Sequence, residues 1–340
     1  MLEQFSFDNL YTSYLNCRRG KRHTTTAIKY EIDALEETYD LAVSVQNRKY
    51  KPSSYHTFSV YEPKEREIMA LPFRDRVVQH CLCKNVLEPA IEPMLIYDTY
   101  ACRKNKGTHA GLYRLEEFLR KHYRKHGTVG WILKGDISKY FNSIDHDILK
   151  AKLYPKLDDD IIWLLDEIID STENPGLPLG NQSSQWFANF YLSSFDHFIK
   201  EKLRIKYYIR YMDDFCLIHP SKDYLRYCLK EIKNYLNENL KLQTNNKTQL
   251  FPIKNGVDFL GFHTYITDTG KVIRKIRRKS KQNMKRKLKK YKKLYVADKI
   301  TKERINLSYQ SWLSHASHGN CYHLIQNMNE KYKEIFEGDG

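Results

Sequence analysis

Hydrophobic residues recur along the chain at intervals that predict helices alternating with short strands. A helix is predicted over residues 24–46, because the apolar residues there recur at helical spacing: Ile28, Ile32, Leu35, Tyr39 and Val43. Further helices are predicted over residues 74–96, 109–126, 145–170, 184–203 and 221–239. Strands are predicted in the alternating stretch HTFSVYEPKEREIMALPF and near residues 242–264. No Gly-rich phosphate loop accompanies this alternation, so the pattern predicts an α+β fold and disfavours Rossmann and P-loop folds.

Three aspartates stand at the ends of predicted strands. The apolar run VGWILKGDI predicts a buried strand that delivers Asp136 to its end. The segment KYYIRYMDDFCLIH predicts a strand, a tight turn with Asp213 and Asp214, and a second strand. Adjacent carboxylates repel each other, and divalent cations relieve that repulsion. The alternative is a solvated acidic turn, as predicted for Asp158 to Asp160 at a helix N-terminus, but apolar flanks favour a metal site at residues 213–214.

The chain carries a large excess of positive charge. Lys and Arg number 57 against 41 Asp and Glu, which gives a formal net charge of +16. A polyanion is therefore the expected partner, since each phosphate that a protein neutralises releases condensed counterions. The 41% hydrophobic and 13% aromatic content excludes general disorder. No apolar run reaches the roughly 18 residues of a membrane span and the N-terminus lacks a signal-peptide pattern, so a cytoplasmic protein with no membrane partner is predicted.

The strongest basic cluster covers residues 271–295, which hold fourteen Lys or Arg and no acid. Apolar residues interrupt it at Val272, Ile276, Met284, Leu288 and Leu294. This spacing predicts a helix with one packed stripe, which we expect to grip a nucleic-acid duplex through its phosphates. A solvated charged face is the alternative, but such a face rarely lacks acids altogether.

The seven cysteines form no CxxC pair, so they are predicted to be reduced thiols rather than a zinc or redox motif. A second group of possible ligands follows the basic cluster, with His315, His318, Cys321 and His323. Their irregular spacing disfavours zinc.

Several motifs resemble those of reverse transcriptases. The segments GDISKYFNSIDH, YMDD and FLGF match the palm motifs of that family in order and spacing, from about residue 60 to 262. The resemblance implies a right-hand polymerase with fingers over residues 1–125, a ferredoxin-like antiparallel palm over 126–262 that includes part of the fingers, and a helical basic thumb over 263–340. It also implies an RNA-directed DNA polymerase that binds template RNA, a primer or cDNA duplex, and dNTPs.

The same resemblance implies roles for individual residues. Asp136, Asp213 and Asp214 would be catalytic and would bind two Mg²⁺ ions, for which Mn²⁺ is an expected substitute. The backbone carbonyl of Ile137 would be a further metal ligand. The Phe141 ring would clash with a ribose 2′-hydroxyl and so favour dNTPs, with simple core packing as the alternative. Lys247 would donate a proton to pyrophosphate.

Further residues are implied to contact the nucleotide or the duplex. The segments REIMALPFRDRVVQ and YACRKNKGTHAG resemble finger motifs of bacterial, group II intron-like enzymes. They supply basic candidates for the triphosphate and template backbone, each with a solvated surface charge as the alternative: Lys64, Arg66, Arg74, Arg76 and Arg103. The residues predicted to touch the template–primer duplex are Tyr211, Met212, Phe259, Leu260, Gly261, Phe262, Arg274, Arg277, Arg278, Lys285 and Arg286.

The segment LGNQSSQ, residues 179–185, narrows the resemblance. Most reverse transcriptases have Gln and Pro where this chain has Leu179 and Gln185, and the pattern here resembles the enzymes of diversity-generating retroelements. Those enzymes copy template adenines unfaithfully for mutagenic retrohoming, and they act with a small accessory variability determinant, a helical oligomer. The resemblance places Leu179, Gly180 and Gln185 near the nucleotide, where an aliphatic side chain in place of an amide weakens discrimination. A neutral packing change at Leu179 is the alternative.

Two other functions stay open from the sequence. One is a phage-defence or other group II intron-like reverse transcriptase, and the other is a non-catalytic RNA-binding protein on a polymerase fold. The presence of Phe141 and all three carboxylates disfavours the non-catalytic alternative.

Overall fold

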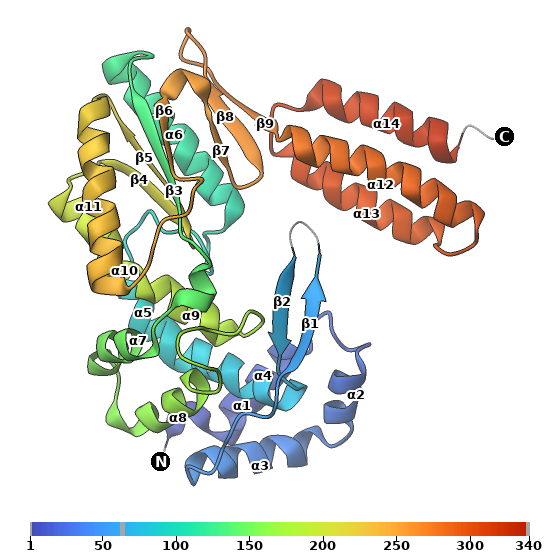
Figure 1. Ribbon diagram of the computed structural model, residues 1–340. Coiled ribbons are helices and arrows are strands. Elements are labelled where there is room, and N and C mark those ends of the chain that lie inside the picture. The colour runs from blue at the N-terminus through green and yellow to red at the C-terminus, as the bar shows by residue number, and fades with distance from the viewer. Residues whose placement is uncertain (1, 62–64, 338–340) are drawn as a thin grey trace.

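The computed structural model describes residues 2–61 and 65–337. The chain forms a helical N-terminal part with a β-hairpin, a central antiparallel sheet with helices on both faces, and a C-terminal bundle of helices (Figure 1). The predicted α+β fold is confirmed. Within the two described ranges, no helix is long and apolar enough to cross a bilayer.

The N-terminal part consists of short helices around one hairpin. Its first long helix begins after Ser6, whose hydroxyl accepts a hydrogen bond from the Asn9 N–H at 3.4 Å. The helices are η1 (Glu3–Phe5), α1 (Phe7–Cys17), α2 (Thr25–Ile32), α3 (Ala34–Gln46), α4 (Phe73–Leu82), η2 (Cys83–Leu87), α5 (Glu88–Ile91) and η3 (Glu92–Met94). The hairpin pairs β1 (His56–Val60) with β2 (Arg66–Ala70) antiparallel, so the predicted strands are confirmed.

The helix predicted over residues 24–46 is broken at Asp33 into α2 and α3. The apolar residues that predicted it are exposed, with Ile32 at 72%, Leu35 at 62% and Tyr39 at 60%. The face that packs is made by other residues, namely Ala27, Tyr30, Leu41, Ala42 and Val45. The spacing thus predicted the helices but not the side that is buried.

The central sheet has four antiparallel strands in the order β4-β5-β3-β6. They are β3 (Trp131–Asp136), β4 (Tyr207–Tyr211), β5 (Asp214–His219) and β6 (Gln249–Pro252). Helices connect β3 to β4 and β5 to β6, so the chain runs β-α-β-β-α-β. This connection and strand order are those of a ferredoxin-like sheet, as predicted for the palm.

Helices cover both faces of the central sheet (Figure 1). Alternate residues of β3 point to opposite faces, so Leu133 joins the core shared with α11 (Lys222–Leu240) and Ile132 joins the core shared with α6 (Thr108–His126). Burial on both sides makes the sheet a firm support for the side chains at its ends.

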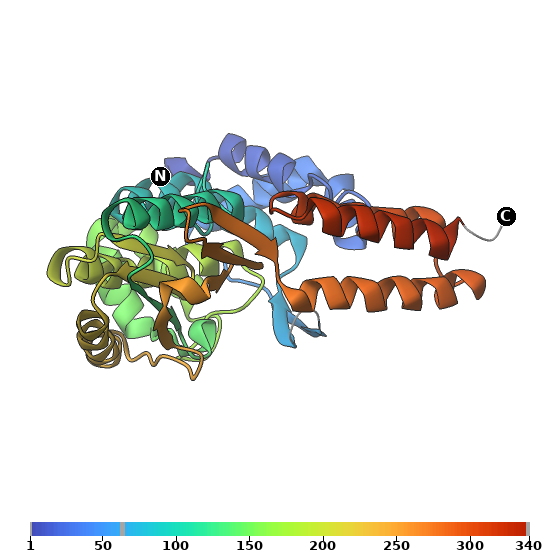
Figure 2. The same cartoon turned by 90° about the horizontal axis from the view of Figure 1, so that it is seen from above.

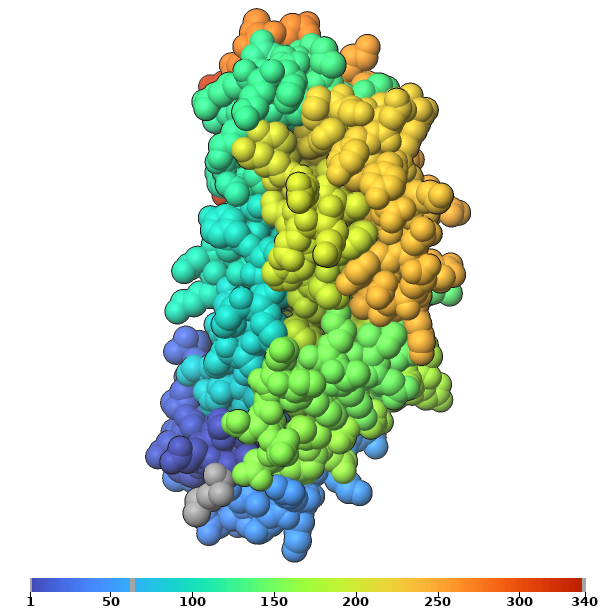
Figure 3. Space-filling view, turned by 90° about the vertical axis from the view of Figure 1, so that its left-hand side faces the viewer, coloured from blue at the N-terminus to red at the C-terminus, as the bar shows by residue number. Residues whose placement is uncertain are grey.

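The long connection from β3 to β4 is helical. Its elements are η4 (Tyr140–Ser143), α7 (His146–Leu153), η5 (Tyr154–Lys156), α8 (Asp159–Ile169), α9 (Gln182–Tyr191), α10 (Ser193–His197) and η6 (Phe198–Lys202). Asp158 precedes α8 and two further acids occupy its first turn, as predicted. The connection packs against the N-terminal part: Figure 3 shows the cyan segment that contains α5 lying along the yellow-green segment that contains α10.

A second sheet and a helical bundle complete the fold. The sheet pairs β7 (Val257–Phe259), β8 (Phe262–Ile266) and β9 (Val272–Ile276), after the short η7 (Ile253–Asn255). The bundle of α12 (Arg278–Val296), α13 (Lys302–Ser317) and α14 (Tyr322–Phe336) projects to one side (Figure 2). The single helix predicted over residues 271–295 is therefore wrong in its first part, because Val272 and Ile276 lie in β9. The predicted boundary at residue 262 divides the β7–β9 sheet, and the division into fingers, palm and thumb stays a prediction.

Candidate active site

Asp136 and Asp214 lie opposite each other at the ends of β3 and β5. Gly135 allows this close pairing, because a Cβ there would lie 2.0 Å from the ring of Phe215 on the neighbouring strand. The turn from β4 to β5 consists of Met212 and Asp213, and Met212 adopts a left-handed conformation with φ of 51°. The structure thus gathers the three predicted aspartates at one end of the central sheet.

Burial and mutual repulsion raise the pKa of two of these carboxyl groups above its ordinary value. Burial raises the pKa of Asp213 to about 6, the nearby Asp136 carboxylate adds to the increase, and Arg66 opposes it. Burial raises the pKa of Asp214 to about 7, although the Lys134 ammonium, 3.4 Å from Asp214 Oδ2, lowers it. Such shifts are common where carboxylates share a binding site.

The chemistry of the donor atoms suits a divalent cation. Asp214 Oδ1 is buried and has no hydrogen-bond partner among residues 2–61 and 65–337, which is costly unless another group neutralises it. Carboxylate oxygens are the ligands that Mg²⁺ prefers in proteins. Within residues 2–61 and 65–337, however, no three His, Cys, Asp or Glu side chains are gathered closely enough to hold a metal ion. The assignment of two metal ions therefore remains a prediction.

A turn after α11 fixes the end of β3. The Asn245 N–H donates to the Asp136 carbonyl at 2.9 Å, and Ile137 forms a β-bridge with Thr244. Lys247 lies in the same turn, exposed, with its N–H donating to the Asn245 side chain at 2.8 Å. The predicted proton donor thus lies in the turn that contacts Asp136.

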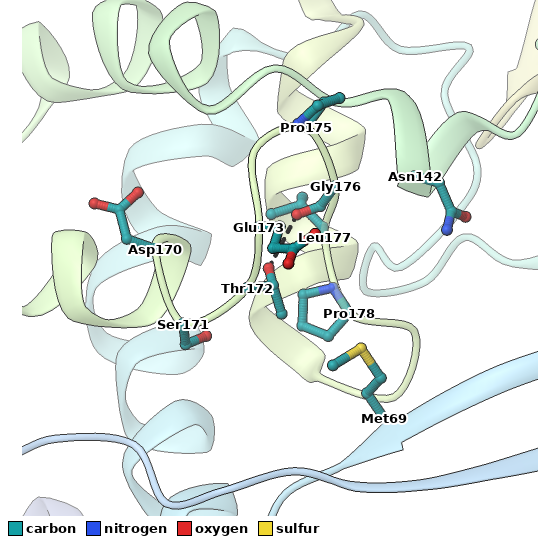
Figure 4. Close-up of a pocket in the computed structure, with 10 residues that line it drawn as sticks. All are labelled: Met69, Asn142, Asp170, Ser171, Thr172, Glu173, Pro175, Gly176, Leu177 and Pro178. Carbon is teal, nitrogen blue, oxygen red and sulfur yellow. Dashed lines mark hydrogen bonds between the residues drawn. The ribbon is translucent and has the colours of Figure 1, made fainter.

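The predicted sugar gate lies just beyond β3. Phe141 is half-buried on η4 and packs edge-on against Tyr140, with ring centroids 5.7 Å apart. The Leu177 N–H donates to the Phe141 carbonyl at 2.8 Å, which ties η4 to the loop before α9. Between η4, this loop and β2 lies a cavity of about 650 Å³, which Asn142, Leu177 and Met69 help to line (Figure 4).

The LGNQSSQ segment contacts the β1–β2 hairpin. The Met69 N–H donates to the Leu179 carbonyl at 2.8 Å. Gly180 has a φ of 135°, and a Cβ there would lie 2.6 Å from the Met69 carbonyl oxygen, so this position requires glycine. Gln185 is exposed and accepts a hydrogen bond from the Cys102 thiol at 2.8 Å. The predicted nucleotide-binding segment is therefore fastened to the hairpin that carries Arg66.

The predicted phosphate-binding side chains fall into different environments. Lys64 lies outside the described residues. Arg66 is exposed at the start of β2, and its charge lowers the pKa of Asp213. Arg74 lies over the Tyr50 ring at 6.0 Å, and Arg76 Nε donates to the Leu71 carbonyl at 2.8 Å. Of this set, Arg66 is the residue that the structure relates to the three aspartates.

Arg103 was predicted to bind phosphate, and the structure places it in a different role. Its side chain is 7% exposed and is paired with Glu92, and it also donates to the carbonyls of Ile96 and Thr99. These contacts use its donors within the protein, so the structure favours a supporting role for Arg103 over phosphate binding.

The residues predicted to touch the template–primer duplex also divide into buried and exposed ones. Phe259 and Phe262 are buried in the protein core, and Arg274 is 7% exposed, with Tyr113 and Phe262 rings against its guanidinium. The prediction that these three side chains contact a duplex directly is therefore wrong, because they are buried. Leu260 and Gly261 form the partly exposed β7–β8 turn, and Tyr211 and Met212 are partly exposed beside Asp213.

The basic side of α12 borders a second cavity. Arg277 is exposed and pairs with Asp258 at 3.2 Å. Arg278 and Arg286 are exposed on α12, and Lys285 is partly exposed. The cavity, of about 900 Å³, lies between α12, α13 and the β7–β8 turn and is lined by Gly261, Arg277, Lys279, Ser280, Asn283, Met284, Arg286, Lys287, Lys290, Trp312 and His315.

Two charged residues near the aspartates were missed from the sequence. Lys134 lies two positions before Asp136 on β3, so strand alternation places it on the same face, a signal that was available. Arg210, two positions before Met212, is fully buried and paired with Asp196. Nothing in the local sequence distinguishes Arg210 from the many solvated arginines.

The chain matches known proteins over most of its length. It fits the family described as reverse transcriptase (RNA-dependent DNA polymerase) over residues 54–264. It is 24% identical over 249 residues to Protein YkfC of Escherichia coli (strain K12), which covers 59% of this chain and 65% of that protein. It is 20% identical over 352 aligned positions to the group II intron-encoded protein LtrA of Lactococcus lactis subsp. cremoris, which covers 78% of this chain and 56% of that protein. The chain thus spans less than two thirds of the length of either relative.

The fold also resembles a solved structure. The structure of apo telomerase from Candida tropicalis, truncated from its C-terminal domain, matches with a TM-score of 0.50 and 14% sequence identity. The match covers 70% of this chain and 60% of that chain. At this identity the match shows a shared fold.

Proposed function

Because the chain belongs to the reverse transcriptase family, we propose that it is an RNA-directed DNA polymerase. The observation that carries the proposal is the set of three aspartates at the end of a ferredoxin-like sheet, where Asp136 and Asp214 are register partners and Asp213 occupies the adjoining turn. Template RNA, a primer or cDNA duplex, and dNTPs are the proposed partners, and Mg²⁺ is the proposed cofactor.

In this proposal each residue has a limited task. Asp136, Asp213 and Asp214 would hold two divalent ions, and the Ile137 carbonyl would be a further ligand. The chemistry that bound Mg²⁺ or Mn²⁺ supplies is activation of a primer 3′-hydroxyl and neutralisation of charge on the leaving pyrophosphate.

Side chains around the three aspartates orient the substrates. Arg66 binds the triphosphate, and Phe141 excludes nucleotides that carry a 2′-hydroxyl. Lys247 gives a proton to pyrophosphate. The exposed Lys and Arg side chains of α12 hold the duplex through its phosphates.

Primer extension on an RNA template with dNTPs and Mg²⁺ tests the proposal. Replacing Asp213 and Asp214 with Asn should abolish extension, because metal ligation needs the full negative charge of the carboxylates. A matched control replaces Asp159 and Asp160, exposed acids in the first turn of α8, with Asn. The assignment fails if the Asp213/Asp214 variant extends the primer as well as this control does.

We further propose that the enzyme belongs to the diversity-generating type, is error-prone at template adenines and acts with a helical accessory protein. The LGNQSSQ segment supports this assignment, together with the position of Leu179 beside the β1–β2 hairpin. A second candidate is a phage-defence or other group II intron-like enzyme, favoured by the similarity to LtrA. Neighbouring DNA distinguishes the two, since a diversity-generating element has an imperfect repeat pair that differs at adenines.

A further inference from the structure

A fully buried ion pair lies beneath the turn that carries Asp213. The side chains of Arg210, on β4, and Asp196, on α10, are both 0% exposed. Arg210 Nε lies 2.7 Å from Asp196 Oδ1, and its Nη2 lies 2.5 Å from Oδ2, so the two planar groups meet side by side.

The remaining donors of Arg210 bind two other segments. Nη1 donates to the Met212 carbonyl at 3.0 Å and to Asn189 Oδ1 at 3.2 Å, and Nη2 also donates to the Asn189 carbonyl at 3.2 Å. A guanidinium has five N–H donors in a fixed planar arrangement, and here each has an acceptor. The orientation of the group is therefore fully determined by the turn after β4, α9 and α10.

The partner of Arg210 is itself held from two sides. The Tyr208 hydroxyl donates to Asp196 Oδ1 at 2.6 Å, and the Thr99 hydroxyl lies 3.3 Å from Oδ2. The segment that carries Thr99 is bonded to β4 as well, through a parallel bridge between Thr99 and Arg210. Asp196 thus cannot turn away without breaking several buried hydrogen bonds.

The contact with Met212 connects this network to the three aspartates. Met212 has a φ of 51°, and its carbonyl belongs to the peptide that it shares with Asp213. A hydrogen bond to that carbonyl fixes the plane of the peptide from which the Asp213 side chain departs. Because buried ion pairs contribute little net stability compared with apolar residues of similar volume, stability alone does not explain the pair.

We propose that Arg210, held by Asp196, is a positioning residue that fixes the Met212–Asp213 peptide so that the aspartates can bind divalent ions. The inference rests on the proposed function of these aspartates and deepens it. Arg210 touches no substrate in this role and acts through the backbone of the turn.

The test replaces Arg210 with Lys, which keeps the positive charge beside Asp196 but cannot reproduce the planar set of five donors. Two quantities are measured on the full chain. They are the Mn²⁺ affinity, by electron paramagnetic resonance, and kcat for primer extension. We expect each to fall by about 10–100-fold, the usual effect of losing a group that orients metal ligands. KM for dNTPs should change far less than kcat.

The matched control is Arg114→Lys. Arg114 pairs with Asp98, whose carboxylate is 5% exposed, through Nε at 2.7 Å, and its other side-chain hydrogen bond goes to Glu117 on its own helix, away from the 212–213 turn. It should keep Mn²⁺ affinity and kcat within about twofold of wild type, because its side-chain hydrogen bonds go to Asp98 and Glu117. Asp196→Asn is a second variant in case Arg210→Lys does not fold, and it should weaken Mn²⁺ binding to a smaller extent.

The proposal is overturned if the folded Arg210→Lys chain, or Asp196→Asn where the first is unfolded, binds Mn²⁺ and extends primers as the Arg114→Lys control does. Failure of the proposed function gives a different result, since wild type would then extend no primer. In that case the Mn²⁺ affinities of the variants relative to wild type still decide whether Arg210 positions the turn.

Discussion

Asp136 on β3 and Asp214 on β5 are register partners, so two carboxylates from distant parts of the chain meet at one end of the central sheet. With Asp213 beside them and no hydrogen-bond partner for Asp214 Oδ1 in the part of the chain that the structure describes, the arrangement opposes ionisation in the metal-free chain. Stability, metal binding and pH are therefore coupled here.

The first prediction concerns this coupling. The pKa values of Asp213 and Asp214 are raised to about 6 and about 7, so the folded chain keeps protons that the unfolded chain has lost, and these two groups lower stability as pH rises from about 4 to 7. Mg²⁺ should raise the free energy of unfolding, and with it the thermal midpoint, more at about pH 8 than at about pH 5; at about pH 8 the gain is about 1.4 kcal/mol when its concentration is ten times Kd. Thermal unfolding with and without Mg²⁺ measures this.

The control is the Asp213→Asn, Asp214→Asn variant. It should be more stable than wild type near pH 8 without metal, because the buried repulsion is gone, and it should respond little to Mg²⁺. An equal effect of Mg²⁺ on wild type at both pH values would contradict the prediction.

The second prediction concerns selection of the sugar. Phe141→Ala should admit rNTPs, raising the ratio of rNTP to dNTP incorporation by roughly tenfold or more, since relief of about 1.4 kcal/mol of steric clash is a factor of ten. Single-nucleotide extension with each substrate measures the ratio. Tyr140→Phe, which removes the hydroxyl that donates to the Ala188 carbonyl but leaves the Phe141 ring, is the control. An unchanged ratio in Phe141→Ala would place the gate elsewhere.

The third prediction concerns α12. Replacing Arg278, Lys285 and Arg286 with Gln should weaken template–primer binding and reduce its log–log salt slope by about 0.7 to 0.9 for each phosphate that the variant no longer neutralises. The control replaces Arg226, Lys230 and Lys233, which are exposed on α11, with Gln. Fluorescence anisotropy across a salt series gives both slopes. Equal slopes for the two variants would mean that α12 presents only a solvated charged face.

The fourth prediction concerns fidelity. Leu179→Gln should lower misincorporation opposite template adenine more than opposite other bases, because one restored hydrogen bond of about 1–1.5 kcal/mol is worth roughly tenfold in selectivity. Sequencing of cDNA made on one defined RNA, with any accessory protein present, measures the effect.

Two outcomes of the fidelity measurement separate the alternatives. If wild type copies adenine as accurately as cytosine, the assignment to the diversity-generating type is wrong and the phage-defence alternative is favoured. If wild type is error-prone and Leu179→Gln leaves it so, Leu179 is a neutral packing change while the assignment stands.

Much of the central sheet was predictable because its signal is local. Apolar runs that end on Asp136 or flank Asp213 predict strands, and the strands bring the acids to one end of the sheet. The long helices were predicted for a similar reason, since their periodicity is contained within each segment. The face of α2 and α3 that packs was not predictable, because Ile32 and Tyr30 both satisfy helical spacing and tertiary contacts choose between them.

The exposure and pairing of individual arginines could not be predicted from the sequence for another reason. Arg66, Arg103 and Arg210 look alike in sequence, yet one is exposed, one is paired with Glu92 and one is sealed against Asp196. Each outcome depends on an acid or carbonyl that the fold brings close. A charge pattern therefore predicts that nucleic acid binds, but not which side chains remain free to bind it.

The pairing of β3 with β6 also governs how the protein is made. Translation delivers β3 first, and the contact between Asp136 and Thr248 spans 112 residues. At roughly 5–20 residues per second, the edge of β3 that pairs with β6 waits about 6–22 s for its partner. An unpaired edge is a template for association with other chains. We therefore expect chaperone supply during that interval to affect how much of this protein a heterologous host yields in soluble form.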